Sequence, residues 1–356
     1  MSPHEWISFS NGQKKCAVRR KISPKLKQTV LVLFLLPLLG WAAPAPARPA
    51  DKTDTLRLES SVVAMGSAYS VAVYGDDRTR MEEAVDAAFE EVRRLDQMLS
   101  NYKPESELSE VNRWAAARPV QVTPEMFSLL SACLAYSRES EGAFDISVGP
   151  LMTIWGFYKG TGRLPHRAEI RGVLEQVGYR NVILDAENRT VRFARQGVEL
   201  DPGGIGKGYA VDRMVEVLKP YGIRTALVSA SGSSIYGLGA PPGEKGWRVQ
   251  IRDPKDESKS VAEVYLKDES MSTSGNYEKF FRAEGHIYSH IMDPRTGWPA
   301  QGVLSVSVIA QRTLDSEAWT KPLFVNGRAW ALKHKPAGLR AFFCEDTAEQ
   351  TCAWLP

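Results

Sequence analysis

The residues best suited to chemistry lie in a glycine-rich segment, residues 203–208, that opens a predicted helix. Backbone N–H groups at a helix N-terminus and the helix dipole can bind phosphate, and Lys207 would add a positive charge. Neither G-x-x-x-x-G-K-[ST] nor G-x-G-x-x-G is formed, so the same residues also fit a tight strand-to-helix turn with an exposed lysine. On these residues alone, both interpretations stay open.

Hydrophobic spacing predicts the elements around this segment. Strands are expected at residues 56–74 (broken at 65–67), 182–184, 191–193, 225–229, 247–251, 260–266 and 303–309, and helices at 80–99, 124–137 and 316–325. Residues 201–210 pass into a further helix, with Val211 and Leu218 among its inward residues and Pro220 and Gly222 closing it. Helices and strands mix without regular βαβ alternation, so we expect an α+β fold with largely antiparallel sheets and packed helices, in one lobe or two. This domain would span residues 56–356.

Composition fits a globular protein with a sizeable core, because 43% of the 356 residues are hydrophobic and 24% are charged. The formal net charge of +3 is small for this length. No basic stripe interleaved with aromatic residues is visible, so nucleic acid is not expected as a partner.

The N-terminus is typical of an export signal. Lysines and arginines within residues 14–27 precede an apolar run at 29–41, and small residues follow. The run is short of the roughly 20 residues that a membrane-spanning helix needs. We therefore expect a signal peptide at residues 1–47 and a linker at 48–55, with an uncleaved membrane anchor as the alternative. No cysteine follows the run, which argues against a lipoprotein; we expect a periplasmic protein, or one at the outer face of the cytoplasmic membrane.

Three cysteines would remain after cleavage. Cys344 and Cys352 flank a polar stretch between apolar residues, so they could join a C-terminal β-hairpin in an oxidising compartment, or stay unpaired. Cys133 lies in an apolar run with helical spacing, which favours a buried, inert thiol.

Several motifs occur in an order that resembles the ApbE family. The glycine-rich segment lies within D-P-G-G-I-G-K-G-Y-A-V-D, which is similar to the family's lysine-glycine motif. Further matches are M-G-S at residues 65–67, L-D-Q-M-L-S-N-Y at 95–102, P-E-S-E-L-S at 104–109, G-A-F-D-I-S-V-G-P-L at 142–151, W-G-F at 155–157, S-T-S-G-N-Y at 272–277 and Y-S-H-I-M-D-P-R-T-G at 288–297. Together they cover most of the chain after the leader.

The resemblance implies FAD as substrate, Mg²⁺ on its pyrophosphate, AMP as leaving group and a Thr or Ser hydroxyl of a partner protein as acceptor. The family's usual acceptor is an electron-transfer protein in or at the membrane. Phosphoryl transfer of this kind requires neutralised phosphate oxygens and acceptor and leaving oxygens roughly in line.

The same resemblance assigns roles to individual residues. Gly204 would offer a backbone carbonyl and Thr320 a hydroxyl to the metal, while Asp201 and Lys207 would hold FAD. The positions that would line the flavin and adenine are Met65, Tyr102, Ala143, Phe144, Asp145 and Ile291. Aromatic side chains suit flat rings, which supports Tyr102 and Phe144.

One position departs from the family pattern A-D-A-x-x-T, because Ser316 occupies the slot of the metal-binding aspartate. Asp315 precedes this slot and Glu317 follows it. On a regular helix Glu317 shares the face of Thr320 better, but Asp315 could reach from a frayed first turn. We expect Asp315 as ligand with Glu317 in reserve, the alternative being that neither binds metal. The family's G-G-D is also altered, to S-G-S-S at residues 231–234.

His290 is the histidine that falls within a matched motif. Its ordinary pKa suits a general base that takes the proton of the acceptor hydroxyl. Two alternatives stay open: a structural histidine bonded to backbone, and an acceptor activated by the metal with no dedicated base.

Three functions are compatible with these residues. FMN transfer to a protein ranks first. A Mg²⁺-dependent FAD pyrophosphatase ranks second, since water in place of the acceptor would give FMN and AMP at the same site. A non-catalytic flavin-binding protein ranks third and is suggested by the altered metal position.

Overall fold

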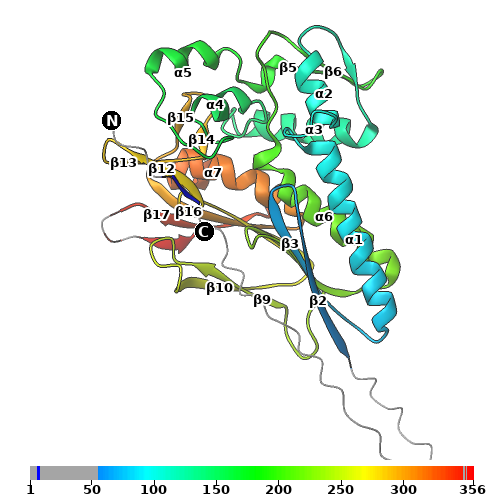
Figure 1. Ribbon diagram of the computed structural model, residues 1–356. Coiled ribbons are helices and arrows are strands. Elements are labelled where there is room, and N and C mark those ends of the chain that lie inside the picture. The colour runs from blue at the N-terminus through cyan, green and yellow to red at the C-terminus, as the bar shows by residue number, and fades with distance from the viewer. Residues whose placement is uncertain (1–5, 9–54, 348, 350) are drawn as a thin grey trace, which may run out of the picture. The chain divides into compact units, whose positions relative to one another are not determined.

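An eight-stranded antiparallel sheet organises the part of the chain that the computed structural model describes, residues 6–8, 55–347, 349 and 351–356 (Figure 1). Its strand order is β18-β17-β16-β11-β8-β7-β3-β2. The strands are β2 (Leu56–Ala64), β3 (Ser67–Gly75), β7 (Thr225–Ala230), β8 (Ser234–Leu238), β11 (Glu269–Gly275), β16 (Val303–Ala310), β17 (Arg340–Glu345) and β18 (Cys352–Trp354). Every residue of β16 is buried, as expected for an inner strand covered on both faces.

Three helices cover one face of this sheet: α1 (Arg78–Leu99), α6 (Gly206–Leu218) and α7 (Thr313–His334). The buried residues of α1 recur every three or four positions, among them Met81, Ala84, Ala88, Val92 and Leu95. This spacing gives one apolar stripe that packs on β2, β3 and α6.

A hairpin covers the opposite face. Strands β9 (Trp247–Arg252) and β10 (Ser260–Leu266) pair with each other, and alternate residues of β9 are buried. Val249, Ile251 and Leu266 pack with Met271 of β11 and Ile309 of β16 in a second hydrophobic cluster. The sheet is therefore the middle layer of three.

The remaining elements build the region beyond the strand ends. They are α2 (Glu107–Trp114), β4 (Val120–Gln121), α3 (Pro124–Glu139), α4 (Gly149–Ile154), α5 (Arg167–Leu174), β5 (Val182–Asp185), β6 (Thr190–Phe193), β12 (Lys279–Ala283), β13 (His286–Ser289), β14 (Met292–Asp293) and β15 (Trp298–Pro299), with short 3₁₀ turns at Tyr179–Asn181, Pro202–Gly204 and Lys219–Tyr221. Strand β1 (Trp6–Ser8) pairs with β12. A third apolar cluster surrounds Trp155 between α4, α5 and β12.

The predicted α+β fold with antiparallel sheets is confirmed, and residues Thr55–Pro356 stay within one compact unit. The last helix is longer than the predicted 316–325. It begins at Thr313 and continues to His334, with a break at Gly327, whose φ of 74° and ψ of 179° are not helical. Apart from Trp6–Ser8 and Thr55, the predicted signal peptide and linker lie outside the described residues.

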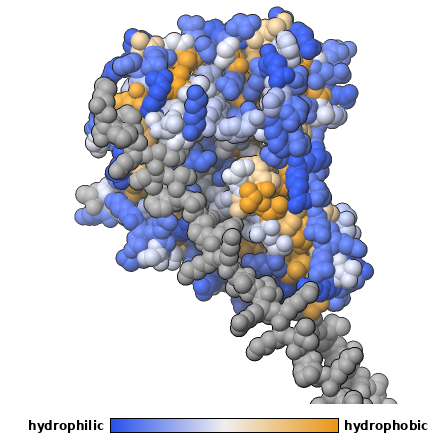
Figure 2. Space-filling view, in the orientation of Figure 1, coloured by the Kyte–Doolittle hydropathy of each residue, from blue (hydrophilic) through white to orange (hydrophobic). Residues whose placement is uncertain are grey.

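No helix in the described ranges is both long and apolar enough to cross a bilayer. Blue, hydrophilic residues dominate the face seen in Figure 2, with an orange patch near the β2–β3 hairpin. Val63 of this hairpin is 71% exposed.

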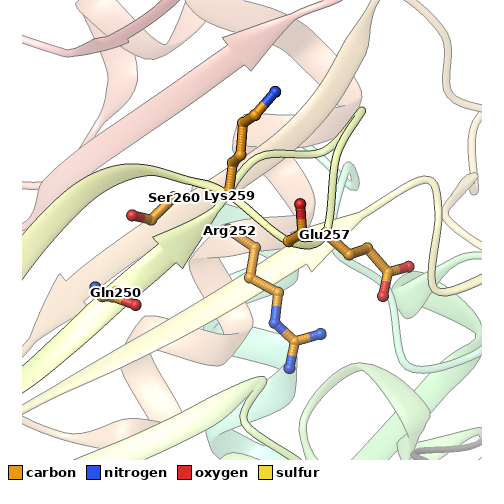
Figure 3. Close-up of a pocket in the computed structure, with 6 residues that line it drawn as sticks. Gln250, Arg252, Glu257, Lys259 and Ser260 are labelled. Atoms are coloured by element: carbon orange, nitrogen blue, oxygen red, sulfur yellow. The ribbon is translucent and has the colours of Figure 1, made fainter.

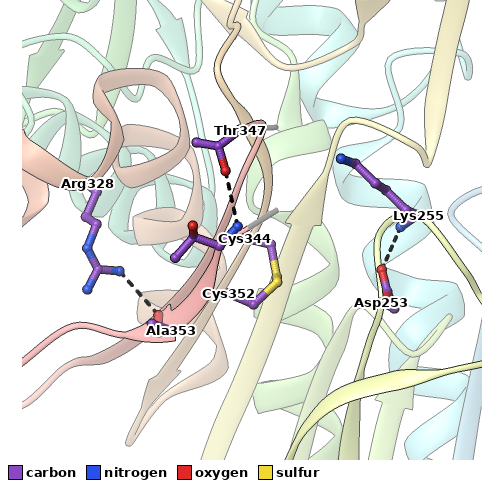
Figure 4. Close-up of a disulfide and its surroundings, with 8 residues drawn as sticks. Asp253, Lys255, Arg328, Cys344, Thr347, Cys352 and Ala353 are labelled. Atoms are coloured by element: carbon purple, nitrogen blue, oxygen red, sulfur yellow. Dashed lines mark hydrogen bonds between the residues drawn. A yellow bond between two sulfur atoms is a disulfide. The ribbon is translucent and has the colours of Figure 1, made fainter. Parts of the chain in front are cut away.

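Of the two alternatives for Cys344 and Cys352, the structure shows the pair. Cys344 and Cys352 form a disulfide across the β17–β18 pair (Figure 4). Arg328 of α7 donates to the carbonyl oxygen of Ala353 in the same hairpin. Cys133 is buried in the main core, and burial raises the pKa of its thiol.

Helices α6 and α7 meet through a glycine. A Cβ on Gly208 would lie 2.5 Å from the carbonyl oxygen of Thr313 and 2.8 Å from Glu317 Oε2. In return, the Asp212 carboxylate of α6 accepts from the backbone N–H groups of Thr313 (2.7 Å) and Leu314 (2.8 Å) at the start of α7. The two helices thus approach to backbone contact.

We expect Gly208→Ala to destabilise the protein by about 1–3 kcal/mol, because a methyl group there must push α7 away. Chemical denaturation measures the change. Gly172→Ala in α5 is the matched control: a Cβ there meets nothing within 4 Å, so its effect should stay within about 1 kcal/mol. Equal losses for both variants would contradict the close α6–α7 contact.

The disulfide should add stability by restricting the unfolded chain. It closes a short loop, with a sequence separation of 8, so we expect reduction or the double variant Cys344→Ser/Cys352→Ser to cost about 2–3 kcal/mol. Thermal unfolding with and without reductant tests this. If reductant lowers the melting temperature of the double variant as much as that of the unchanged protein, the loss does not come from this bond.

Candidate functional site

The glycine-rich segment folds as the turn that the sequence predicted. Residues Pro202–Gly204 form a 3₁₀ turn, and α6 begins two residues later at Gly206. The Asp201 carboxylate caps the turn by accepting from the N–H of Gly203 at 2.7 Å. Lys207 Nζ lies 2.5 Å from Ser233 Oγ, at the β7–β8 turn where the family's G-G-D pattern is altered. Lys207 thus places an ammonium beside the glycine-rich turn, whereas the first-turn N–H of Gly208 is bonded to the Glu317 carboxylate.

Two tyrosines stand beside Asp201. The Tyr158 hydroxyl donates to Asp201 Oδ2 at 3.1 Å, and its ring meets that of Tyr102 edge to face, with centroids 5.9 Å apart. Tyr102 is 71% exposed and so presents a ring to solvent. Burial raises the pKa of Asp201, against the opposing effect of its bonds from Gly203 and Tyr158.

Met65 covers the glycine turn from the β2–β3 hairpin. Its backbone has a φ of 50°, and its Cε lies 3.3 Å from where a Cβ on Gly206 would stand. Phe144 lies on another side of the turn, since its Cε2 is 3.6 Å from the corresponding position on Gly204. The structure therefore brings these two predicted residues to one turn.

Ala143, Asp145 and Ile291 are buried. The Asp145 carboxylate accepts from the N–H and the hydroxyl of Ser147 (2.8 and 2.7 Å) and from the N–H of Tyr179 (2.5 Å). These bonds commit it to a local turn. The contact of Ala143, Asp145 and Ile291 with the flavin or adenine stays a prediction. Because the Asp145 carboxylate is already bonded, its backbone would make that contact.

The two predicted oxygen donors to a metal are both near the start of α7. Thr320 is buried, with its hydroxyl donating to the Glu317 carbonyl at 2.7 Å and lying 2.8 Å from Ser274 Oγ. Gly204 adjoins Lys321, whose Cε is 3.6 Å from the Cβ position of that glycine.

The two acidic candidates point in different directions. Asp315 bonds to the Tyr136 hydroxyl of α3 and pairs with Arg312 at 2.7 Å, so it faces away from Thr320. Glu317 accepts from the N–H of Gly208. Ser316, in the family's aspartate slot, bonds to Ser270 and Ser272 of β11 (3.0 and 2.8 Å). The geometry does not favour Asp315 as metal ligand.

Within the described ranges, no three His, Cys, Asp or Glu side chains cluster in a way that could hold a metal ion. A Mg²⁺ site of oxygen donors would have the Gly204 carbonyl and the Thr320 hydroxyl, and the Glu317 carboxylate lies near them, with Oε1 3.8 Å from Lys321 Nζ. Of the two acidic candidates, Glu317 is therefore the one beside these donors, and the magnesium site stays a prediction.

Lys321 is a site residue that the sequence analysis missed. Its Nζ donates to the Glu317 carbonyl at 3.1 Å and lies 3.8 Å from Glu317 Oε1. Burial lowers its pKa to about 8. Its place in the sequence, directly after Thr320, could have pointed to it. The direction of its side chain, however, depends on the packing of α7 against the turn Pro202–Gly204.

His290 lies at the end of the β12–β13 hairpin. Its Nδ1 is 3.1 Å from the Lys279 carbonyl oxygen, so the Nδ1–H tautomer donates there and leaves the lone pair on Nε2. Burial, followed by the charge of Lys279, lowers the pKa of His290 to about 3, and the charges of Lys207 and Lys321 act in the same direction. The bond to the Lys279 carbonyl agrees with the alternative of a structural histidine. The role of His290 as general base stays a prediction, and the ring would start neutral.

A separate polar hollow lies at the β9–β10 hairpin (Figure 3). Gln250, Arg252, Glu257, Ser258, Lys259 and Ser260 line it. None of these belongs to the predicted site, and the side chains of Arg252 and Lys259 point to opposite sides. They do not converge on a ligand.

The lowered pKa of His290 predicts a pH effect on stability. Between about pH 6.5 and 3 the unfolded chain binds a proton at His290 that the folded protein does not bind. The free energy of unfolding therefore decreases as the pH is lowered, by at most about 1.4 kcal/mol per pH unit. His290→Gln should flatten this part of the curve from denaturation at several pH values. His286→Gln, at an exposed position of the same hairpin, is the control. Identical slopes for His290→Gln and the unchanged protein would count against a neutral His290 ring in the folded protein.

The sequence is similar to a known protein family and to named enzymes. The model of the ApbE family matches residues 65–343. The FAD:protein FMN transferase of Klebsiella pneumoniae (strain 342) is 32% identical over 268 residues, covering 74% of this chain and 81% of that protein. The enzyme of the same name from Treponema pallidum (strain Nichols) is 33% identical over 300 residues, or 78% and 82% of the two chains.

Solved structures agree. The ApbE protein of Thermotoga maritima aligns with a TM-score of 0.76 at 31% identity, covering 84% of this chain and 96% of that one. The apo flavinyl transferase ApbE of Pseudomonas stutzeri gives 0.75 at 28% identity, covering 85% and 94%. Motifs, fold and relatives coincide, and the chain belongs to the ApbE family.

Proposed function

We propose that this protein transfers the FMN half of FAD to a Thr or Ser hydroxyl of a partner protein and releases AMP. The observation that carries the proposal is the family match over residues 65–343, which contains the whole Asp201–Lys207 turn. Relatives of similar length carry the name FAD:protein FMN transferase. The turn carries the Lys207 ammonium at the start of α6, and an ammonium suits a phosphate group.

The proposed reaction is a displacement at phosphorus. The acceptor oxygen attacks the phosphorus on the FMN side, the bond to the bridging oxygen breaks, and AMP leaves with the electron pair. Lys207 binds the pyrophosphate, and Tyr102 offers its exposed ring to a flat ring of FAD. His290 would take the hydroxyl proton on Nε2, because Nδ1 is engaged with Lys279.

The proposal includes Mg²⁺ as a bound ion but gives it no separate step. The family resemblance implies Mg²⁺, a Lewis acid for the phosphate oxygens, and the donors at hand would be Gly204 and Thr320. Since Asp315 is paired with Arg312, we assign no step to the metal.

The partner and the compartment are further parts of the proposal. We expect the acceptor to be a membrane-associated electron-transfer protein and the enzyme to be exported, periplasmic or at the outer face of the cytoplasmic membrane. The Cys344–Cys352 disulfide supports an oxidising compartment.

The test incubates the protein with FAD and Mg²⁺, with and without a peptide that carries a flavinylation-type Thr. AMP is followed by chromatography and the peptide by mass. We expect AMP together with FMN-modified peptide. Lys207→Ala should slow AMP release by about 100-fold or more, because it removes a charge at the phosphates. Lys219→Ala at the exposed far end of the same helix is the matched control.

Other outcomes point to other functions. AMP with only free FMN would indicate a pyrophosphatase. Bound FAD without AMP would contradict both catalytic functions and favour a flavin-binding protein.

A further inference from the structure

The loop after α4 brings Tyr158 to the candidate site. Trp155 is fully buried, and its indole N–H donates to the carbonyl oxygen of Gly297 at 3.0 Å. The ring of Phe157 packs against that of Phe281, with centroids 5.9 Å apart. Because these two neighbours are anchored, the backbone that carries Tyr158 is held in place.

Tyr158 contacts two residues that are expected to hold FAD. Its hydroxyl donates to Asp201 Oδ2 at 3.1 Å, while the other carboxylate oxygen, Oδ1, accepts from the N–H of Gly203 at 2.7 Å. Its ring meets the exposed ring of Tyr102 edge to face, with centroids 5.9 Å apart. One side chain thus links the carboxylate to the aromatic ring.

The Asp201 carboxylate depends on its donors to stay charged. Burial raises its pKa, whereas the bonds from Gly203 and Tyr158 and the charge of Lys279 act in the opposite direction. Burial, followed by the charges of Asp201 and Glu199, raises the pKa of Tyr158, so its hydroxyl remains a protonated donor. The charge of Asp201 in turn helps to raise the pKa of Glu199, after burial.

A carboxylate held at both oxygens still has acceptor sites for a ligand. An ionised carboxylate offers about four lone-pair sites, and Gly203 and Tyr158 use two of them. The remaining sites suit N–H or O–H donors, which FAD carries on its adenine, its ribose and its ribityl chain. Because two bonds fix the carboxylate, a donor on FAD would meet an acceptor that is already oriented.

We propose that Tyr158 is a positioning residue for FAD. Its hydroxyl orients the Asp201 carboxylate and its ring fixes the Tyr102 ring, so that both contacts are preformed before FAD binds. The inference rests on the proposed function for the identity of the ligand, and it names the residue that aligns two of the predicted FAD contacts.

The experiment measures FAD binding to the full chain by flavin fluorescence between about pH 5 and 8. Tyr158→Phe removes the hydroxyl and keeps the ring, so we expect FAD to bind about tenfold more weakly at neutral pH. Without this donor Asp201 takes up a proton at a higher pH. The pH at which the FAD affinity has halved should therefore rise in the variant.

A second variant tests the ring. Tyr158→Met removes the hydroxyl and the ring together, so we expect the same shift in pH and a further loss of affinity of about threefold, because the contact with Tyr102 is lost as well. Tyr265→Phe is the matched control, since the Tyr265 hydroxyl also donates to a carboxylate, Glu263 Oε1 at 2.8 Å, but in strand β10 outside the candidate site. It should leave the FAD affinity and its pH dependence unchanged.

The pH dependence separates positioning from a general structural effect. Unchanged FAD binding in Tyr158→Phe, or an equal loss of affinity at every pH, would overturn the role of the hydroxyl. Equal affinities of Tyr158→Phe and Tyr158→Met would overturn the role of the ring. If Tyr158→Phe does not fold, the pH shift in Tyr158→Met decides.

AMP release with the acceptor peptide is measured separately, by chromatography. Bound FAD without AMP release would contradict the proposed transfer, while the binding comparison would still decide the role of Tyr158. Failure of the unchanged protein to bind FAD would overturn both.

Discussion

The site depends on how the first turns of α6 and α7 hold each other. Asp212 of α6 caps the start of α7 through the N–H groups of Thr313 and Leu314, and Glu317 of α7 accepts from the N–H of Gly208 in α6. Each helix thus satisfies donors that the other leaves open at its N-terminus. The absence of a side chain at Gly208 makes this approach possible.

This reciprocal capping decides which side chains can reach a substrate. It occupies Glu317, while Ser316 is drawn to β11 and Asp315 to Arg312 and Tyr136. The residue one turn after Glu317 is Lys321, which therefore points back along α7 to the glycine turn. The same packing that turns Asp315 away brings Glu317 and Lys321 together here, with Glu317 Oε1 3.8 Å from Lys321 Nζ. The charges of Lys279, Lys207 and Lys321 help to lower the pKa of His290.

Local patterns were sufficient for most of the fold. The apolar stripe of α1, the Thr123 cap and Pro124 at the start of α3, and the β5–β6 hairpin all follow from neighbouring residues. The turn that holds Asp201 and Lys207 could be predicted from neighbouring residues. The direction of side chains that depend on tertiary contacts could not. Asp315 takes its direction partly from Tyr136, 179 residues away, and no spacing within 313–320 contains that contact. The continuation of α7 beyond 325 likewise depends on Gly327, where two helical stretches meet.

The approach of α6 and α7 also sets the charge beside the glycine-rich turn. Lys321 Nζ donates to the Glu317 carbonyl at 3.1 Å and lies 3.8 Å from Glu317 Oε1, while Oε2 of the same carboxylate accepts from the N–H of Gly208. The carboxylate and the ammonium therefore offset each other's charge at short range. Because one bond of this group crosses to α6, a shift of α7 would change both the helix contact and the charge next to Gly204.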